Sequence, residues 1–322
     1  MIDGSSRRPK LPRMTRLRFH RPVIVSALLL AAACDKQGAT ARPGPGAAAT
    51  DTGYASLATT TVDSSWSPAT GPVLLLQGET RDEALVVPPS EGDSGAIARL
   101  SALGVKNADV VMFGRGGAHL TAQLEAMPRT TEAQCRLWPL RAVKGAANSD
   151  GWAIGFVGGD VSAMALDSVQ RLGSRDSMAL AAEASRLASN VTTPTAPSFQ
   201  GLRFAAHDIR RFEASPGVQA LVAHLIRRVN QEASPLEEQT LLIAERDSGV
   251  TSGPYQLAYA ERANGMEEEV PTPEVVGGVR IQRRPTLIVA RDSDLGVTYS
   301  MLERTAARRW RIRWTSGSQH CE

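Results

Sequence analysis

Histidine and carboxylate side chains are the groups in this chain that could carry hydrolytic chemistry. Four of the five histidines follow the basic N-terminal segment and lie far apart: His119, His207, His224 and His320. An imidazole acts as a general base beside a nucleophile, with a carboxylate to orient it. His207-Asp208 places an imidazole next to a carboxylate in the sequence, so it is the first histidine to consider for such a role.

Three short segments resemble catalytic or phosphate-binding motifs, and each lacks a required partner. Gly92-Asp93-Ser94-Gly95 resembles the nucleophile motif of trypsin-like serine proteases, but only His20 of the N-terminal segment precedes it to act as base. Asp51-Thr52-Gly53 resembles the aspartic protease triplet without a second copy. Gly114-Arg115-Gly116-Gly117 lacks the Lys-Ser/Thr of a phosphate loop and predicts a hairpin turn. We therefore assign no catalytic residue, and these segments favour a non-catalytic role over an enzymatic one.

A row of arginines near the C-terminus is the one feature that could bind an anion. The alternating residues are Arg309, Trp310, Arg311, Ile312, Arg313 and Trp314. The period-two pattern of a strand places the aromatic residues on one face and the arginines on the other. Such a row could contact phosphate headgroups or an acidic partner. The alternative is a solvated face that discourages pairing at a sheet edge.

The cysteines predict a disulfide rather than a metal site. Cys135 and Cys321 remain after the N-terminal segment, and an exported chain meets an oxidising compartment in many bacteria. We predict a Cys135–Cys321 disulfide that ties the C-terminus to the first half, with two buried, unpaired thiols as the alternative. No cluster of histidine and cysteine has the spacing of zinc ligands. We expect neither a metal nor a cofactor.

The N-terminus has the three parts of a secretory signal. Residues 1–21 are basic, residues 23–33 are apolar over about half the length that spans a bilayer, and Cys34 follows. The ending Leu30-Ala31-Ala32-Ala33-Cys34 resembles the lipobox of bacterial lipoproteins, with Ala31 at the place where that family usually has leucine. The resemblance covers this segment alone. It implies cleavage before Cys34 and a membrane anchor of acyl chains on its sulfur.

An ordinary cleaved signal, with Cys34 incidental, is the alternative to the lipobox. Translation could begin at Met1 or at Met14. Either way, we expect the mature chain in the cell envelope, facing the periplasm or the exterior.

The charge of the mature chain gives no support for nucleic-acid binding. The full sequence has a net charge of +3, but removal of residues 1–33 leaves 29 basic and 32 acidic residues, which is a net charge of −3. The partners we expect are a membrane, reached through the lipid anchor, and an envelope protein or glycan. The predicted function is a non-catalytic binding or structural role. The alternative is an envelope hydrolase whose site assembles from distant residues around His119 or His207.

The composition divides the mature chain into a tether and two halves. Residues 35–70 are rich in Ala, Thr, Gly, Pro and Ser and predict a disordered tether. Residues 71–191 predict an N-terminal α+β half, and residues 199–322 a C-terminal half of mostly antiparallel strands. The predicted fold class is therefore α+β, a strand-rich body with few helices and with antiparallel hairpins in the C-terminal half.

Short apolar runs between turn residues predict the strands of the first half, and 3.6-residue periodicity predicts its helices. The expected strands are 72–76, 84–87, 109–113, 118–122, 135–138 and 152–157. The expected helices are 94–103 and, most clearly, 176–190, which ends at Asn190.

The second half leaves one segment open between helix and strand. A strand is expected through residues 202–205. Residues 218–229 have a helical apolar stripe after Ser215-Pro216, but Ser215-Pro216-Gly217 could equally be a turn that leads into a strand. Residues 234–237 match a capping box at a helix start. Two similar strand–turn–strand segments, 240–262 and 286–304, predict paired hairpins in one sheet.

Overall fold

The structure is a computed structural model that describes residues 74–87, 108–128, 140–146, 151–157, 160–192, 196–229, 235–249 and 253–318. In chain order its elements are β1 (Leu74–Gln77), β2 (Glu83–Val87), β3 (Ala108–Phe113), β4 (His119–Pro128), β5 (Leu140–Lys144), β6 (Ile154–Val157), β7 (Val161–Ala163), β8 (Asp167–Ser168), η2 (Val169–Arg171), α2 (Ser174–Ser189), η3 (Pro197–Phe199), β9 (Ala205–Ser215), β10 (Val218–Val229), β11 (Leu236–Asp247), β12 (Gln256–Met266), β13 (Thr272–Ile281), β14 (Arg284–Ser293), β15 (Gly296–Ala306) and β16 (Arg309–Thr315). In these ranges, no helix is both long and apolar enough to cross a bilayer.

The first six strands close into a barrel in the order β1-β2-β5-β4-β3-β6, with antiparallel neighbours throughout. Alternate residues of a strand point to opposite faces. Leu75 packs in the cluster with Val110 and Met112, while Leu74 and Leu76 pack in a different cluster on the other face. Both faces of β1 are therefore buried, which explains its uninterrupted run of leucines.

The remaining strands form two five-stranded antiparallel sheets. The helix-side sheet has the order β12-β11-β10-β9-β8, and the barrel-side sheet has the order β16-β15-β14-β13-β7. One core cluster contains residues of both sheets, among them Phe212 and Leu241 of the first and Leu287, Leu302 and Trp310 of the second. The two sheets therefore pack face to face as a β-sandwich.

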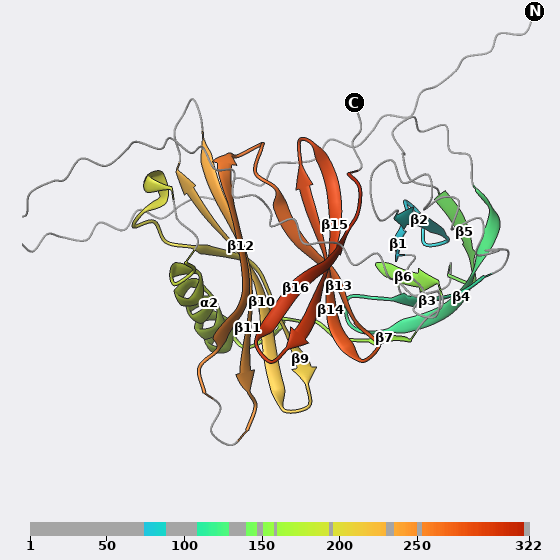
Figure 1. The fold of residues 1–322 in the computed structure, drawn as a ribbon, viewed down its shortest axis with the longest axis horizontal. Coiled ribbons are helices and arrows are strands. Elements are labelled where there is room, and N and C mark those ends of the chain that lie inside the picture. The colour runs from blue at the N-terminus through green and yellow to red at the C-terminus, as the bar shows by residue number, and fades with distance from the viewer. Residues whose placement is uncertain are drawn as a thin grey trace, which may run out of the picture. The chain divides into compact units, whose positions relative to one another are not determined.

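The outer face of each sheet is covered by another element (Figure 1). Helix α2 buries Ala184 and Leu187 against Leu221 and Leu242 of the helix-side sheet. On the barrel-side sheet, Val279, Ile288, Met301 and Trp314 pack with barrel residues such as Phe156. The barrel approaches this sheet so closely at Gly277 that an added Cβ would lie 2.8 Å from Cδ1 of Ile154.

The strand interpretation of residues 218–229 is confirmed, and the helix interpretation is wrong. The loop Pro216-Gly217 joins Ser215 to Val218, which are paired across the β9–β10 hairpin. Gly217 has a φ of +76°, as the second central residue of a type II turn requires. Strand β10 buries Ala220 and Val222 in the sandwich and its alternate residues under α2, so its apolar run resembles a helical stripe.

Two further expectations in the second half are corrected. The capping box is wrong, because strand β11 begins at Leu236. The paired hairpins exist as β11–β12 and β14–β15, but they lie in the two facing sheets and not in one. Strand β9 begins at Ala205, so it starts where the expected 202–205 strand ends.

Several expectations for the first half are confirmed. Strands β1, β2, β3, β4 and β6 overlap the predicted runs, and the turn at Gly114–Gly117 joins β3 to β4. Helix α2 spans Ser174–Ser189 with Asn190 as its C-cap, which confirms the helix expected over 176–190. The antiparallel, strand-rich character is also confirmed, and the described body is mostly β. The signal, the tether, the 94–103 helix and the 135–138 strand lie outside the described residues.

The segment before residue 192 contributes strands to both sheets of the sandwich. Strand β7 pairs with β13 of the barrel-side sheet, and β8 pairs with β9 of the helix-side sheet. The short connection from β7 to β8 buries Met164 and Leu166 in the sandwich core. The chain thus passes from the barrel into both sheets before α2 begins.

Candidate functional site

A cavity of about 320 Å³ lies where the β3–β4 turn of the barrel meets both sheets. This volume is near the lower end of the range for small-molecule sites. The residues that line it come from three regions far apart in sequence: Arg115; His207, Asp208, Arg210, Val222 and His224; and Thr272, Pro273, Glu274 and Val275. We refer to it as the histidine cavity.

Neighbouring strands bring the two histidines of the cavity together. Asp208 of β9 is directly paired with His224 of β10, and the register shifts immediately after this pair. A β-bulge inserts one extra residue into a strand and redirects its side chain. At this bulge the rings of His207 and His224 lie 4.8 Å apart between centroids, tilted by 55°.

A buried chain of hydrogen bonds leads from His224 away from the cavity. His224 Nε2 bonds Oε1 of Gln239, and Nε2 of Gln239 donates to Oε1 of Glu237. Oε2 of Glu237 accepts from Nε of Arg228 at 2.5 Å, and Arg228 is half exposed. The chain crosses from the cavity wall to the protein surface through the end of the sandwich.

The orientation of this chain defines the protonation of His224. A carboxylate is an acceptor, so the Gln239 amide turns its NH₂ group to Glu237 and its carbonyl oxygen to His224. Nε2 of His224 must then carry the proton, which leaves Nδ1 as an acceptor in the neutral ring. Burial lowers the pKa of His224, and nearby His207 lowers it further, against opposite effects of the Gln239 hydrogen bond and of Asp208. The ring is therefore neutral at neutral pH.

Two ion pairs flank the cavity. Arg115 pairs with Glu274, and both side chains are about half exposed, at 45% and 57%. Nε of Arg210 donates to Oδ2 of Asp208 at 2.8 Å, and this second pair is more deeply buried. The two arginines and two carboxylates balance, so the lining carries no net charge when its histidines are neutral.

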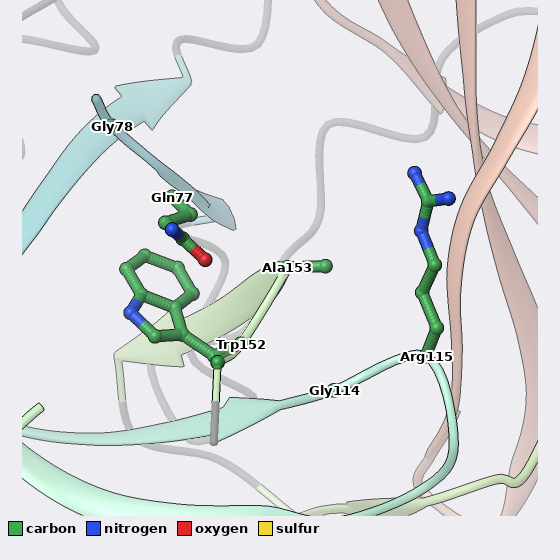
Figure 2. Close-up of a pocket in the computed structure, with 7 residues that line it drawn as sticks. Gln77, Gly78, Gly114, Arg115, Trp152 and Ala153 are labelled. Atoms are coloured by element: carbon green, nitrogen blue, oxygen red, sulfur yellow. The ribbon is translucent and has the colours of Figure 1, made fainter. Parts of the chain in front are cut away.

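A second cavity, of about 480 Å³, opens at the end of the barrel. Figure 2 shows Gln77 and Trp152 at one side of it and Arg115 at the other, with Gly114 and Ala153 between them. The indole Nε1 of Trp152 donates to the backbone oxygen of Arg81 at 2.7 Å, which fixes the ring. Arg115 lines both cavities, so they adjoin at its side chain.

The arginine row lies on β16, at the edge of the barrel-side sheet, and Arg309, Arg311 and Arg313 are all exposed. The expected single aromatic face is wrong. Trp310 packs inside the sandwich and Trp314 packs on the barrel side. A shift in the β15–β16 register between Ile312 and Trp314 causes this exchange of faces.

The other residues singled out in the sequence do not join the histidine cavity. His119 is exposed at the start of β4, where its ring lies 6.5 Å from that of Phe113. His320 lies outside the described residues, as do Cys34, Cys135 and Cys321, so the lipidation and disulfide predictions concern a part of the chain not described here. In the described ranges, no group of three or more His, Cys, Asp or Glu side chains could hold a metal ion.

Sequence reasoning selected His207 and Asp208 but missed the partners that make the cavity. His224, Arg115 and Glu274 come from elements that only the fold brings together. A signal for His224 existed, because it interrupts an apolar strand that is otherwise buried on both faces. A polar residue at such a position needs buried partners, and Gln239 and Glu237 of β11 provide them.

Comparison with protein-family models, with curated proteins and with solved structures finds no match to this chain.

Proposed function

We propose that this chain is a lipid-anchored cell-envelope protein that binds a partner through the histidine cavity, in a non-catalytic role. The signal segment and Cys34 support the anchor, which would hold the body in the envelope, facing the periplasm or the exterior. An envelope protein or a glycan is the class of partner. The role of Cys34 and the location rest on sequence alone.

The observation that carries the binding role is the lining of the cavity. Its apolar surface comes from Val222, Pro273 and Val275, and its polar groups come from four elements: the β3–β4 turn, β9, β10 and β13. Apolar surface combined with positioned polar groups is typical of ligand sites. The polar groups are held in place, since Asp208 is paired with Arg210 and His224 is bonded to Gln239. Fixed polar groups around apolar walls favour selective binding.

An envelope hydrolase is the alternative, and the proximity of His207, Asp208 and His224 favours it. Of the described residues that line the cavity, Thr272 carries the one hydroxyl group. Within the described ranges, no hydrogen bond joins this hydroxyl to either imidazole, whereas a nucleophile is activated by such contact with its base. The binding role is therefore the better supported of the two.

The anchor is tested by metabolic labelling with an alkyne analogue of palmitate in the native host. We expect label on the native chain and none on the Cys34→Ser variant, with the latter recovered outside the membrane fraction. Label that persists in Cys34→Ser, or a native chain without label, would exclude the proposed anchor.

The binding role is tested by photo-crosslinking in the envelope. A photoreactive residue at Thr272 lies in the cavity wall, and one at Met178, which is 66% exposed on α2, serves as the matched control. We expect a defined protein or glycan captured at Thr272 and absent at Met178. Identical products from both positions would count against the cavity. Turnover in a hydrolase substrate screen that is lost in His207→Gln would favour the alternative.

The arginine row is proposed as a second contact, to an acidic partner or to phosphate headgroups. Arg309 and Arg311 are exposed on an edge strand, and Arg175 and Arg203 are exposed elsewhere. We expect Arg309→Gln with Arg311→Gln to weaken sedimentation with anionic vesicles more than the pair Arg175→Gln with Arg203→Gln. Equal losses of vesicle sedimentation in the two double variants would indicate that the arginine row is only a solvated face.

A further inference from the structure

The wall of the histidine cavity contains an acceptor atom that no described residue satisfies. His224 is 4% exposed, and its bonded neighbours Gln239 and Glu237 are 3% and 2% exposed. Burial of polar groups is costly unless they are hydrogen-bonded. Oε1 of Gln239 accepts the hydrogen bond from Nε2 of His224, but no described residue donates a hydrogen bond to Nδ1. Since His224 lines the cavity, its free acceptor is available to a ligand there.

Asp208 offers a second acceptor next to the first. Its Oδ2 accepts from Arg210, and no described residue donates to Oδ1. Asp208 and His224 are paired residues on adjacent strands, so their side chains lie on the same face of the sheet. A ligand group that donates two hydrogen bonds, or two adjacent donor groups, would satisfy both atoms.

The same cavity also presents donors and apolar walls. Arg115 and Arg210 each have more N–H groups than their single carboxylate partners use. Val222, Pro273 and Val275 supply the apolar surface. The lining thus provides acceptors, donors and apolar contact within the space of one small chemical unit.

The charge balance of the lining selects against charged ligands. Each arginine is already paired with a carboxylate, so a charged ligand would have to displace one of these partners or remain uncompensated. An uncompensated charge in a partly buried site is unfavourable. The ligand that fits this cavity is a neutral molecule whose groups both donate and accept hydrogen bonds. It also has C–H faces that can pack on the apolar walls.

We infer that the histidine cavity binds a neutral sugar unit of an envelope glycan, with hydroxyl groups donating to Nδ1 of His224 and to Oδ1 of Asp208. Other hydroxyl oxygens accept from Arg115 and Arg210, and the C–H faces pack on the valines and Pro273. This inference deepens the proposed binding function and rests on it. The buried chain through Gln239 acts as a positioning device, because it keeps the proton on Nε2 and the acceptor in the cavity.

The test is ¹⁵N NMR of the histidine rings in the full chain carrying Cys34→Ser. Its first readout is the tautomer of His224, which we expect to be protonated on Nε2. Its second is titration with neutral glucose, galactose, mannose and N-acetylglucosamine, against cationic glucosamine and anionic glucuronate. We expect a neutral sugar to shift the His224 Nδ1 resonance, and both charged probes to bind about tenfold or more weakly than it.

Two variants test the groups of the histidine cavity that the inference uses, one on the sugar contact and one on the His224 tautomer. Asp208→Ala removes the Oδ1 acceptor together with the carboxylate partner of Arg210, and it is expected to weaken sugar binding by at least about tenfold, which is the loss of one hydrogen bond. Gln239→Leu removes the acceptor that keeps the proton on Nε2 of His224 and is expected to change the His224 tautomer signature. Arg175→Gln, at an exposed position of α2, is the matched control and leaves both readouts unchanged.

The inference is overturned by any of three results. These are a His224 ring protonated on Nδ1, the absence of a shift with every neutral sugar, and tighter binding of glucosamine or glucuronate than of any neutral probe. The broader binding role fails separately, when photo-crosslinking at Thr272 captures nothing that Met178 does not. Capture of a charged or protein partner at Thr272 would support the broader binding role and exclude a neutral sugar as the ligand.

Discussion

The carboxylate of Glu245 is the contact whose perturbation tests the packing of the two sheets most directly. Glu245 lies on β11 and is 1% exposed. Its Oε1 accepts from Nε of Arg304 at 2.8 Å and from Nε1 of Trp310 at 2.6 Å. Its Oε2 accepts from Nη2 of Arg304 at 2.9 Å and from the backbone N–H of Arg308 at 3.0 Å. All four donors belong to the β15–β16 hairpin of the opposite sheet.

The magnitude follows from the burial of the groups that remain. Glu245→Ala leaves the guanidinium of Arg304, whose side chain is 14% exposed, without its carboxylate. Breaking a buried ion pair in this way costs about 3–5 kcal/mol of unfolding free energy. Glu245→Gln keeps one acceptor oxygen but turns an NH₂ group toward donors, so we expect a smaller loss of about 1.5–3 kcal/mol.

The assay is urea unfolding of the full chain carrying Cys34→Ser, followed by tryptophan fluorescence. Glu267→Gln is the matched control, because Glu267 pairs with Arg228 at the surface, where the two side chains are 43% and 53% exposed. We expect the control to lose less than about 1 kcal/mol. A loss for Glu245→Gln no larger than that of the control would refute the reasoning.

The pH dependence gives a second check on Glu245. Burial acts to raise its pKa, but the hydrogen bonds from Arg304, Arg308 and Trp310 outweigh burial and hold the pKa below its ordinary value of 4.5. A depressed carboxyl pKa stabilises the fold above pH 4.5, and this contribution is lost as the pH falls through the folded-state pKa. The difference in stability between the native chain and Glu245→Gln should therefore shrink below pH 4.5. A constant difference down to pH 3 would contradict this.

Three further predictions concern a turn, a close approach and the histidine cavity. Gln282 and Arg283 have φ values of 50° and 66° in a two-residue hairpin loop, so replacement by Asn-Gly should raise the unfolding free energy by about 1 kcal/mol in urea. Gly277→Val would crowd Ile154 and should lower the unfolding free energy by about 1–3 kcal/mol. An unchanged unfolding free energy would contradict this close approach of the barrel to the sheet. Because the pKa of His224 lies below its ordinary 6.5, stability should fall as the pH drops below 6.5, and less steeply in His224→Gln.

Local sequence signals correctly predicted those elements that depend on residues close together in the chain. The apolar spacing before Asn190 predicted α2, and the glycines at 114–117 predicted the β3–β4 turn. The segment 218–229 stayed ambiguous because its strand is buried on both faces, so period two was hidden in a continuous apolar run. The wrong capping box at 234–237 has the same origin, since strand β11 is also buried on both faces.

The candidate site was predicted only in part. His207-Asp208 stood out because imidazole and carboxylate are adjacent in the chain. Arg115 and Glu274 are separated by 159 positions, and no pattern in the sequence relates them. Their contact depends on how the β3–β4 turn reaches β13.

By itself the sequence determined the features that depend on near neighbours: the turn at Gly114–Gly117, helix α2 and the antiparallel hairpins. These arise from backbone dihedral preferences and side-chain periodicity, which act over a few residues. The tertiary structure alone decided which hairpins share a sheet, which faces the two tryptophans of β16 occupy, and that His224 meets His207 in a cavity beside Arg115. Those outcomes depend on bulges and on face-to-face packing between distant segments, where burial of surface from both partners sets the arrangement.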